Sequence, residues 1–415
     1  MSCEHAAQRP CRLCGEALRQ TFVDLGESPL ANALLEEEDL DREEPRFPLH
    51  VYVCSRCFLV QLEEFAAPET IFVDYAYFSS YADTWRRHCA AFATQAIDRL
   101  ELGARSRVIE VASNDGCLLR EFRQRGIPVL GVEPAGNVAE AAVAAGVPTI
   151  TEFFGAACAG RLAEDGTADL LVANNVLAHV PDLHDFIEGM RILLSPAGVI
   201  TVEFPHLLRL IEQCQFDTIY HEHFSYFSFA AAARAFEAHG LTVFDVERIP
   251  VHGGSLRLYV RHQGTAQPAV TDRVAGLREQ ETNAGLDRIE TYAGFEERVR
   301  DIRRRLLGLL CARHDSGGRL AAYGAPAKGN TLLNYCGIGP DLIEYTVDRN
   351  PRKQGRRLPG SRLPVYAPEA IRERKPDGIL ILPWNLKDEI MEQVGYVREW
   401  GARFVVPIPE PEVLP

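Results

Sequence analysis

The segment YHEHFSYF, residues 220–227, places a glutamate between two histidines, with aromatic residues before and after them. Imidazole accepts a proton near neutral pH and also binds metals, so this spacing is compatible with an acid–base site, a metal site or a packed strand. It lacks the four-residue histidine spacing of the HExxH zinc signature. In a regular strand, His221 and His223 would share one face, and Tyr220 and Glu222 the other.

Two CxxC pairs, CRLC and CSRC, supply four thiols near the start of the chain. Four thiolates form the usual ligand set of a structural, tetrahedral zinc site that leaves no position open for catalysis. The alternatives are free thiols, redox pairs or a site that recruits Cys3 or His5, and residues 15–53 form a longer loop than usual. We expect zinc bound by four residues: Cys11, Cys14, Cys54 and Cys57.

The segment VIEVASNDGCLL is typical of a strand, a tight loop and a helix, and Glu133 ends the next strand. A carboxylate at that place can accept hydrogen bonds from both ribose hydroxyls. The loop has one glycine instead of GxGxxG, which disfavours a diphosphate and favours S-adenosylmethionine over a dinucleotide, although another nucleoside stays open. The candidate cofactor ligands are Glu110, Ser113, Asn114, Asp115, Gly116, Glu133, Pro134, Asn137, Asn174 and Asn175.

A second loop, YGAPAKGNT, also follows a strand and opens a helix. Glycine, lysine and a helix N-terminus together suit phosphate oxygens, so Lys328, Gly329, Asn330 and Thr331 are candidates for a diphosphate. Asp348 ends the next strand and could bind a ribose or a base. A basic loop follows, which is either solvated or a clamp for an anionic substrate; its residues are Arg349, Arg352, Lys353, Arg356 and Arg357. An NAD site is disfavoured because GxGxxG is again absent.

Apolar strands alternate with amphipathic helices over most of the chain, which predicts parallel sheets covered by helices. The strands expected in the central region are 107–112, 128–133, 169–174, 198–204, 241–249 and 255–260, and the last two suggest a closing hairpin. A later helix should bury one face, formed by Phe295, Val299, Ile302, Leu306 and Leu309. We expect an α/β protein in four parts: 1–70 (zinc-binding), 71–262 (Rossmann-like, cofactor-binding), 263–316 (helical connector) and 317–415 (smaller doubly wound domain).

The bulk composition limits the function. The 415 residues carry a net charge of −14, which disfavours binding to nucleic acid or to anionic membranes. No apolar run approaches the length of a membrane span, and the first residues do not resemble a signal peptide. Eleven cysteines at irregular spacing do not suggest a disulfide framework. We expect a cytoplasmic monomer.

Taken together and in order, nine motifs resemble the sugar C-methyltransferase family, whose members methylate carbon 3 of dTDP-linked 4-keto-deoxysugars and carry an N-terminal zinc-binding domain. The motifs are CRLC with CSRC, VDYAYFSSY, EVASNDG, GVEPAGNVAEAA, NNVLAHVPDL, YHEHFSYFS, HGGSLRLYV and YGAPAKGNTLLNY. The resemblance covers nearly the whole chain. Ala112 departs from it, since methyltransferases of this sheet type often carry glycine there.

The resemblance implies a catalytic group around the YHEH motif. It includes Tyr220, Glu222 and His223, with His179 and a tyrosine that is either Tyr75 or Tyr77. We expect His223 to be the base and Glu222 to orient it or hold the sugar, while His179 and the tyrosine bind the ketone oxygen; His179 or His221 could instead be the base. If Glu222 and His223 both contact the sugar, the backbone there must be irregular.

The expected function is therefore C-methylation of a nucleotide-linked ketosugar, with S-adenosylmethionine and structural zinc as cofactors. Substrate-binding residues would be Lys328, Gly329, Asn330, Thr331, Asp348 and Arg352. The alternatives are methylation of another carbon or another nucleotide sugar, and a zinc-ribbon binding protein without catalytic activity.

Overall fold

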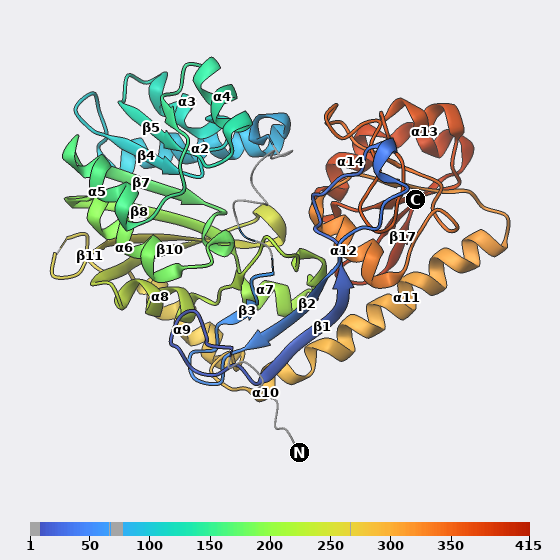
Figure 1. The fold of residues 1–415 in the computed structure, drawn as a ribbon, viewed down its shortest axis with the longest axis horizontal. Helices are drawn as coiled ribbons and strands as arrows, with labels where there is room; N and C mark the ends of the chain where they lie inside the picture. The colour runs from blue at the N-terminus through green and yellow to red at the C-terminus, as the bar shows by residue number, and fades with distance from the viewer. Residues whose placement is uncertain (1–8, 66, 68–77, 266) are drawn as a thin grey trace.

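The computed structural model describes residues 9–65, 67, 78–265 and 267–415, and the chain forms three β-sheets (Figure 1). Tyr75 and Tyr77, predicted in the catalytic group, and the alternative zinc ligands Cys3 and His5 lie outside the described residues. Within the described ranges, no helix is both long and apolar enough to cross a membrane.

The first sheet is antiparallel and joins two distant parts of the chain. Its strand order is β1 (Gln20–Ser28), β2 (Phe47–Val53), β3 (Val60–Leu62) and β9 (Ser225–Tyr226). β9 belongs to the YHEHFSYF segment and pairs with β3 through Val60–Tyr226 and Gln61–Ser225. The end of this segment is therefore held by the N-terminal sheet.

The second sheet has seven strands in the order β10-β11-β8-β7-β4-β5-β6. β4 to β8 are parallel, and β11 and β10 complete the sheet as an antiparallel hairpin. All six strands expected from the sequence are present, whereas the short β6 was not predicted. The bounds are β4 Val108–Val111, β5 Val129–Val132, β6 Thr149–Ile150, β7 Ala168–Asn174, β8 Leu194–Pro205, β10 Leu241–Ile249 and β11 Ser255–His262.

Helices cover this sheet because their apolar residues pack on the strands, forming two buried clusters of aliphatic and aromatic side chains. Their bounds are α2 Asp83–Leu100, α3 Cys117–Arg123, α4 Gly136–Ala144, α5 Ala156–Glu164, α6 Leu183–Leu193 and α8 Phe229–Glu237. The short helix α7 (Leu207–Glu212) instead buries its apolar residues in the core shared by the first and third sheets.

Three helices connect the second and third sheets: α9 (Asp272–Asn283), α10 (Glu290–Ala293) and α11 (Phe295–Asp315). Figure 1 shows α11 running along the outside of the C-terminal lobe. It buries the predicted face with one correction: Leu310 is buried, whereas Leu309 is 36% exposed. Leu310, four positions after Leu306, returns closest to the same face of the helix. Leu309, three positions after Leu306, lies further round the helix, nearer to solvent.

The third sheet has the order β14-β13-β12-β15-β16-β17, parallel except for β17. Its strands are β12 Leu320–Tyr323, β13 Thr346–Val347, β14 Val365–Tyr366, β15 Gly378–Ile381, β16 Arg403–Val406 and β17 Glu412–Leu414. Its helices are α12 Ala327–Cys336, α13 Glu369–Arg374 and α14 Lys387–Gln393. The expected α/β fold class, with a small cysteine-bearing N-terminal part and a second α/β unit, is confirmed; the exact domain limits stay a prediction.

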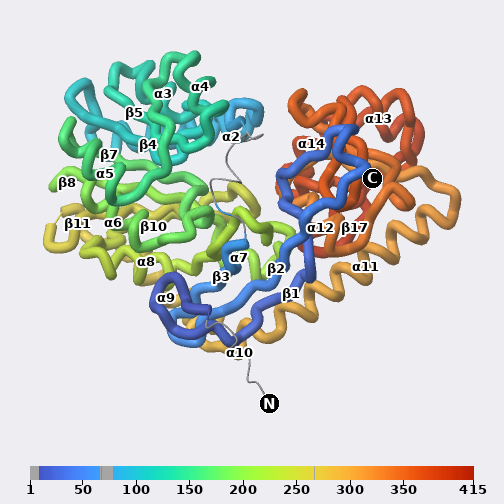
Figure 2. Tube along the Cα trace, viewed as in Figure 1, coloured from blue at the N-terminus to red at the C-terminus, as the bar shows by residue number. Residues whose placement is uncertain are grey.

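One N-terminal loop reaches the C-terminal lobe. The chain between β1 and β2 leaves the first sheet and crosses onto the third, as the blue trace in Figure 2 shows. Leu35 forms a β-bridge with Arg357, and Glu44 accepts a hydrogen bond from the backbone of Gly360 at 2.6 Å. Residues from the two ends of the chain are thereby fixed next to each other.

Candidate active site

Residues 220–223 form a turn, not the regular strand considered from the sequence. The His223 amide donates to the Tyr220 carbonyl at 2.8 Å, and β9 begins only at Ser225. The next amide, of Phe224, donates to the Ala178 carbonyl at 2.7 Å and ties the turn to the short helix Leu177–His179. The irregular backbone required for Glu222 and His223 to act together is therefore present.

The turn fixes the orientation and the tautomer of His223. Its Nδ1 lies 2.8 Å from the Thr218 carbonyl, which can only accept, so Nδ1 carries the hydrogen. In the neutral ring Nε2 then has a lone pair, which accepts from the Tyr220 hydroxyl at 2.8 Å. Burial holds the pKa of His223 well below its ordinary value, and the proximity of His179 disfavours a charge on both rings at once. The ring is neutral at pH 7 and its basic nitrogen is Nε2.

His179 lies against this ring. The two imidazole centroids are 4.6 Å apart with the planes at 73°, and His179 also hydrogen-bonds with the backbone of Glu222. Burial lowers the pKa of His179 to about 4, so this ring is also neutral near pH 7. The structure thus brings together Tyr220, His223 and His179 of the predicted catalytic group.

Glu222 is 2% exposed and has one oxygen without a hydrogen-bond partner, Oε2. Its Oε1 accepts from the Asn32 amide nitrogen at 2.6 Å. Burial raises the pKa of Glu222 to about 7. Because Thr218 and Tyr220 occupy both nitrogens of His223, Glu222 accepts no hydrogen bond that would orient that ring in this structure; holding the sugar is the role that stays open.

His221 points elsewhere. Its Nε2 donates to the Pro48 carbonyl at 3.2 Å, and the ring packs edge-on against Phe47 and Phe65 of the N-terminal sheet region. Burial lowers its pKa. These contacts separate His221 from the other two histidines and make it the least suitable of the three as a base.

Lys328 approaches the turn from the C-terminal lobe. Its Nζ lies 4.6 Å from the centre of the Trp384 ring and donates to Asn385 at 2.9 Å. The Trp384 indole in turn donates to Asp217 Oδ2 at 2.6 Å. Burial lowers the pKa of Lys328, and the lysine charge is among the causes that lower the pKa of His223. Asp217 and Trp384 were not identified from the sequence.

The remaining residues predicted to bind a diphosphate have other contacts. Asn330 donates to the Ala31 carbonyl at 2.6 Å, and Thr331 donates to the Ile219 carbonyl at 2.8 Å. A side chain at Gly329 would meet Leu382 at 2.9 Å, so glycine there permits close packing. In this structure Asn330 and Thr331 therefore fasten α12 to the N-terminal loop and to the chain just before the YHEH turn.

Asp348 and the basic loop likewise make contacts within the protein. The Asp348 carboxylate accepts from the amides of Ala325 at 2.7 Å and Asn350 at 2.8 Å. Arg352 lies over the Phe78 ring at 4.5 Å. Among the other basic residues, Lys353 donates to the Ala325 carbonyl, while Arg356 and Arg357 pair with Glu36 and Glu37. The basic loop is therefore not simply solvated: part of its charge joins two lobes.

The expected cofactor loop lies at the carboxyl ends of β4 and β5. Glu133 accepts from the Asn114 amide through Oε2 and from the Ala135 amide through Oε1, each at 2.9 Å. The loop alternates left-handed residues, with φ of 54° at Ala112, 50° at Asn114 and 72° at Gly116. Alanine pays a small conformational cost there, about 1 kcal/mol, which explains why glycine is favoured in related loops. Pro134 and Asn137 follow Glu133 at the start of α4.

The donor set at this edge fits S-adenosylmethionine. Buried side-chain atoms without a hydrogen-bond partner gather on the loop and strand ends: Glu110 Oε2, Ser113 Oγ, Asp115 Oδ1, Asn174 Oδ1 and Asn175 Oδ1. Burial, and then the neighbouring acidic groups, raise the pKa of Glu110 well above its ordinary value. An edge rich in carboxyl and amide oxygens suits a ligand that has ribose hydroxyls, an ammonium and a sulfonium.

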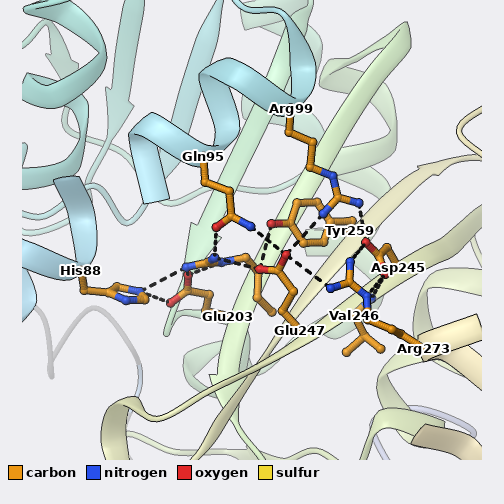
Figure 3. Close-up of polar contacts among 10 residues, drawn as sticks. His88, Gln95, Arg99, Glu203, Asp245, Val246, Glu247, Tyr259 and Arg273 are labelled. Carbon is orange, nitrogen blue, oxygen red and sulfur yellow. Dashed lines mark hydrogen bonds and ion pairs between the residues drawn. The ribbon is translucent and has the colours of Figure 1, made fainter. Parts of the chain in front are cut away.

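A third acidic residue at the end of a strand, Glu203 of β8, was not identified from the sequence. It is fully buried between Arg257, whose Nε donates to it at 2.6 Å, and His88, whose Nε2 lies 2.8 Å away. Figure 3 shows the network continuing through Glu247 to Arg99 and Arg273. The network fixes α2 to β8 beside the expected cofactor edge. Glu203 lies at the end of a strand expected from the sequence, as Glu110 and Glu133 do, and this position is the signal that could have identified it.

The four predicted zinc ligands converge. The sulfur atoms of Cys11, Cys14, Cys54 and Cys57 all lie within 4.8 Å of one another. Tetrahedral zinc with Zn–S bonds of about 2.3 Å places sulfurs about 3.8 Å apart, so this group fits the ion. The Gln61 side chain donates to Cys11 Sγ at 3.1 Å and accepts from the Arg12 amide at 3.0 Å. A structural zinc site therefore lies beside the turn between β2 and β3.

Three protein-family models match successive parts of the chain. Residues 11–72 match a zinc binding domain, residues 85–246 a methyltransferase domain, and residues 250–409 a C-methyltransferase C-terminal domain. With the four-cysteine cluster, these matches confirm the two expected cofactors, S-adenosylmethionine and zinc.

A curated relative covers almost the whole chain. C-methyltransferase NovU of Streptomyces niveus is 39% identical over 405 residues, which is 97% of this chain and 96% of that protein. Among solved structures, the CcbJ methyltransferase of Streptomyces caelestis is similar over 48% of this chain and all of its own, with 14% identity and a TM-score of 0.36. Magnesium protoporphyrin IX methyltransferase of Synechocystis, with bound SAH, covers 46% of this chain and 91% of its own, at 14% identity and a TM-score of 0.34.

Proposed function

Because this chain belongs to the C-methyltransferase family that includes NovU, we propose that it methylates carbon 3 of a nucleotide-linked, 4-keto deoxysugar, with dTDP as the nucleotide. The observation that carries this proposal is the neutral His223 ring, whose Nδ1 is held by a carbonyl and whose Nε2 is left as an oriented base. A hydrogen next to a ketone is acidic enough for such a base to remove.

The proposed reaction begins with proton removal. The Tyr220 hydroxyl rotates off Nε2 when the sugar binds, and the carbon–hydrogen bond then breaks with its proton going to Nε2 and its electron pair delocalising onto the ketone oxygen. The imidazolium that results is stabilised through Nδ1 by the Thr218 carbonyl at 2.8 Å. The Tyr220 hydroxyl can then turn from donor to acceptor and bind the new Nε2 hydrogen.

The anion on the sugar requires donors and alignment. His179, packed 4.6 Å from His223, is suited to bind the oxygen that gains charge, with Tyr75 or Tyr77 as a second donor. Glu222 Oε2, buried and without a partner, is suited to accept a hydrogen bond from a sugar hydroxyl. S-adenosylmethionine, when bound, supplies the electrophilic methyl group. The ends of β4, β5 and β7 hold the cofactor through the residues named above.

We propose a corresponding division of the chain. Residues 1–70 bind zinc, 71–262 bind the cofactor, 263–316 connect, and 317–415 bind the nucleotide part of the substrate. Lys328 supports the last assignment, because its ammonium group lies over the Trp384 ring, donates to Asn385, lowers the pKa of His223 through its charge, and can pair with a diphosphate. Gly329, Asn330, Thr331, Asp348 and Arg352 would act around it mainly by shaping the loops. A cytoplasmic location and a monomeric state stay predictions.

A substrate screen tests the proposal. The purified protein is incubated with methyl-¹³C-labelled S-adenosylmethionine and a set of nucleotide-linked ketosugars, and the products are analysed by mass spectrometry and ¹³C NMR. We expect one labelled methyl group on carbon 3 of a 4-ketosugar. A label on oxygen, on nitrogen or on a different carbon would contradict the proposed reaction.

A further inference from the structure

A side chain from the zinc-binding part of the chain binds the carboxylate of the YHEH turn. Asn32 Nδ2 donates to Glu222 Oε1 at 2.6 Å, across 190 residues of sequence. Among the described residues, Asn32 is the side chain that donates a hydrogen bond to this carboxylate, and the other oxygen, Oε2, is buried without a partner. The contact therefore decides which carboxylate oxygen is used within the protein and which one is left for a ligand.

Asn32 is held in place from the C-terminal lobe. It lies in the loop after β1, where the Leu34 amide donates to the Asn32 carbonyl at 2.9 Å. The carbonyl of the preceding residue, Ala31, accepts from Asn330 Nδ2 at 2.6 Å, and Asn330 is itself buried. A side chain pinned at its neighbouring peptide loses little additional entropy when it makes a hydrogen bond, which favours a positioning role.

The chain that follows Glu222 is held by the strand beside the zinc site. The chain after the turn enters β9, where Ser225 pairs with Gln61 of β3. Gln61 also binds the zinc ligand Cys11 through its side chain at 3.1 Å. The two partners of the Asn32–Glu222 contact are therefore anchored separately, one on α12 and one on the zinc-binding end of the first sheet. The hydrogen bond between them connects these two parts of the protein.

We propose that Asn32 is a positioning residue for methyl transfer: by binding Oε1 it holds the Glu222 side chain so that Oε2 is the acceptor for a hydroxyl of the sugar substrate. This inference rests on the function proposed above and adds to it. The zinc-binding domain then contributes to the active site as well as to the fold, through one amide.

A purely structural role for Asn32, as a latch between lobes, makes a different prediction. A latch would contribute to stability independently of Glu222, whereas a positioning residue has its effect only while Glu222 can act. A double-mutant cycle with Asn32→Ala and Glu222→Gln separates the two because non-additivity measures their coupling. Asn32→Asp keeps the shape but removes the donor, and Asn283→Ala, on the exposed end of α9, is the matched control.

The kinetic experiment uses the zinc-loaded full chain with the ketosugar identified in the screen. We expect Asn32→Ala and Asn32→Asp to lower kcat about 10- to 100-fold, the loss typical for a hydrogen bond to a charged group, with a smaller change in KM. Bound zinc and S-adenosylmethionine affinity should stay as in the wild type, and Asn283→Ala should be unaffected. The double variant should be no slower than Glu222→Gln alone. Wild-type turnover in Asn32→Ala, or additive losses in the double variant, would overturn the proposal.

A second readout needs no substrate. The infrared carbonyl band of the protonated Glu222 carboxyl, assigned by its loss in Glu222→Gln, is followed against pH in the wild type and in Asn32→Ala. The Asn32 hydrogen bond lowers the pKa of Glu222, so its loss should move the titration to higher pH. An unchanged titration would overturn the inference. If the wild type methylates no ketosugar, the proposed function fails, and this titration alone decides whether Asn32 controls Glu222.

Discussion

His223 Nε2 lies 2.8 Å from the hydroxyl of Tyr220, the residue three positions earlier, and the turn between them closes with a backbone hydrogen bond of the same length. Because the two residues are three positions apart, one turn supplies both the proposed base and the hydroxyl group that binds its Nε2 before the substrate does. The Thr218 carbonyl accepts a hydrogen bond from His223 Nδ1, and a carboxylate often has this role in orienting a catalytic histidine. The ring is held in one tautomer without the charge that would raise its pKa.

Tyr220→Phe removes the donor to Nε2 while keeping the aromatic ring. We expect kcat to fall about 10- to 100-fold, because the imidazolium formed during the reaction loses its acceptor at Nε2. S-adenosylmethionine affinity, measured by calorimetry, should not change. Tyr366→Phe on β14 is the matched control, and equal rates for the two variants would exclude a role for the Tyr220 hydroxyl.

Glu222 should make the stability of the protein depend on pH in the direction opposite to that of a salt-bridged acid. Burial raises its pKa from 4.5 to about 7, so the folded state holds the proton more tightly than the unfolded state. The stabilising contribution is present below about pH 4.5 and is lost as the pH rises through about 7, for a total of about 3 kcal/mol. Denaturant unfolding at pH 5 and pH 8 should show a smaller decrease in Glu222→Gln than in the wild type. An equal decrease in both proteins would show that Glu222 does not have a raised pKa.

Removal of zinc should disturb the catalytic turn while the cofactor site survives. Gln61 joins Cys11 to the β3–β9 pairing that follows the turn, whereas the loop around Glu133 lies on the second sheet. Cys11→Ser should lower bound zinc from about one ion per chain, by metal analysis, and abolish turnover, while calorimetry still detects S-adenosylmethionine binding. Cys311→Ser, outside the cluster on α11, is the control. Full activity without zinc would contradict this coupling.

Glu133→Gln should weaken S-adenosylmethionine binding about tenfold or more, because a neutral amide is a weaker acceptor for ribose hydroxyls and for the Asn114 and Ala135 amides. Isothermal calorimetry measures the affinity directly, and Glu140→Gln on the exposed face of α4 serves as the control. Unchanged affinity in Glu133→Gln would mean that the cofactor does not use the end of β5.

Much of the fold follows from the sequence because the central strands are apolar runs bounded by turn residues, and their buried faces leave few arrangements. β9 could not be predicted in this way: two residues form a strand only because Gln61 and Val60 lie beside them, and that pairing is non-local. Leu309 was misplaced for a local reason, since both it and Leu310 continue an apolar stripe and only packing decides between them.

The candidate site divides in the same manner. The YHEH residues and His179 were identified from motifs, and the four cysteines from spacing, because these residues are close in sequence or belong to a recognisable pattern. Asn32, Asp217 and Trp384 had no such signal: each acts through a partner far along the chain, as in the Trp384–Asp217 contact at 2.6 Å. For Asn330 and Thr331 the motif predicted phosphate contacts, whereas the structure uses their side chains for backbone carbonyls.

The measurement that tests the central claim most directly is solvent deuterium exchange at carbon 3 of the ketosugar, followed by NMR in heavy water without S-adenosylmethionine. The wild type should exchange that hydrogen, because His223 removes it before methyl transfer. His223→Ala should show no enzyme-dependent exchange, while His314→Ala, at the exposed end of α11, should exchange like the wild type. Exchange at the wild-type rate in His223→Ala would contradict the assignment of His223 as the base.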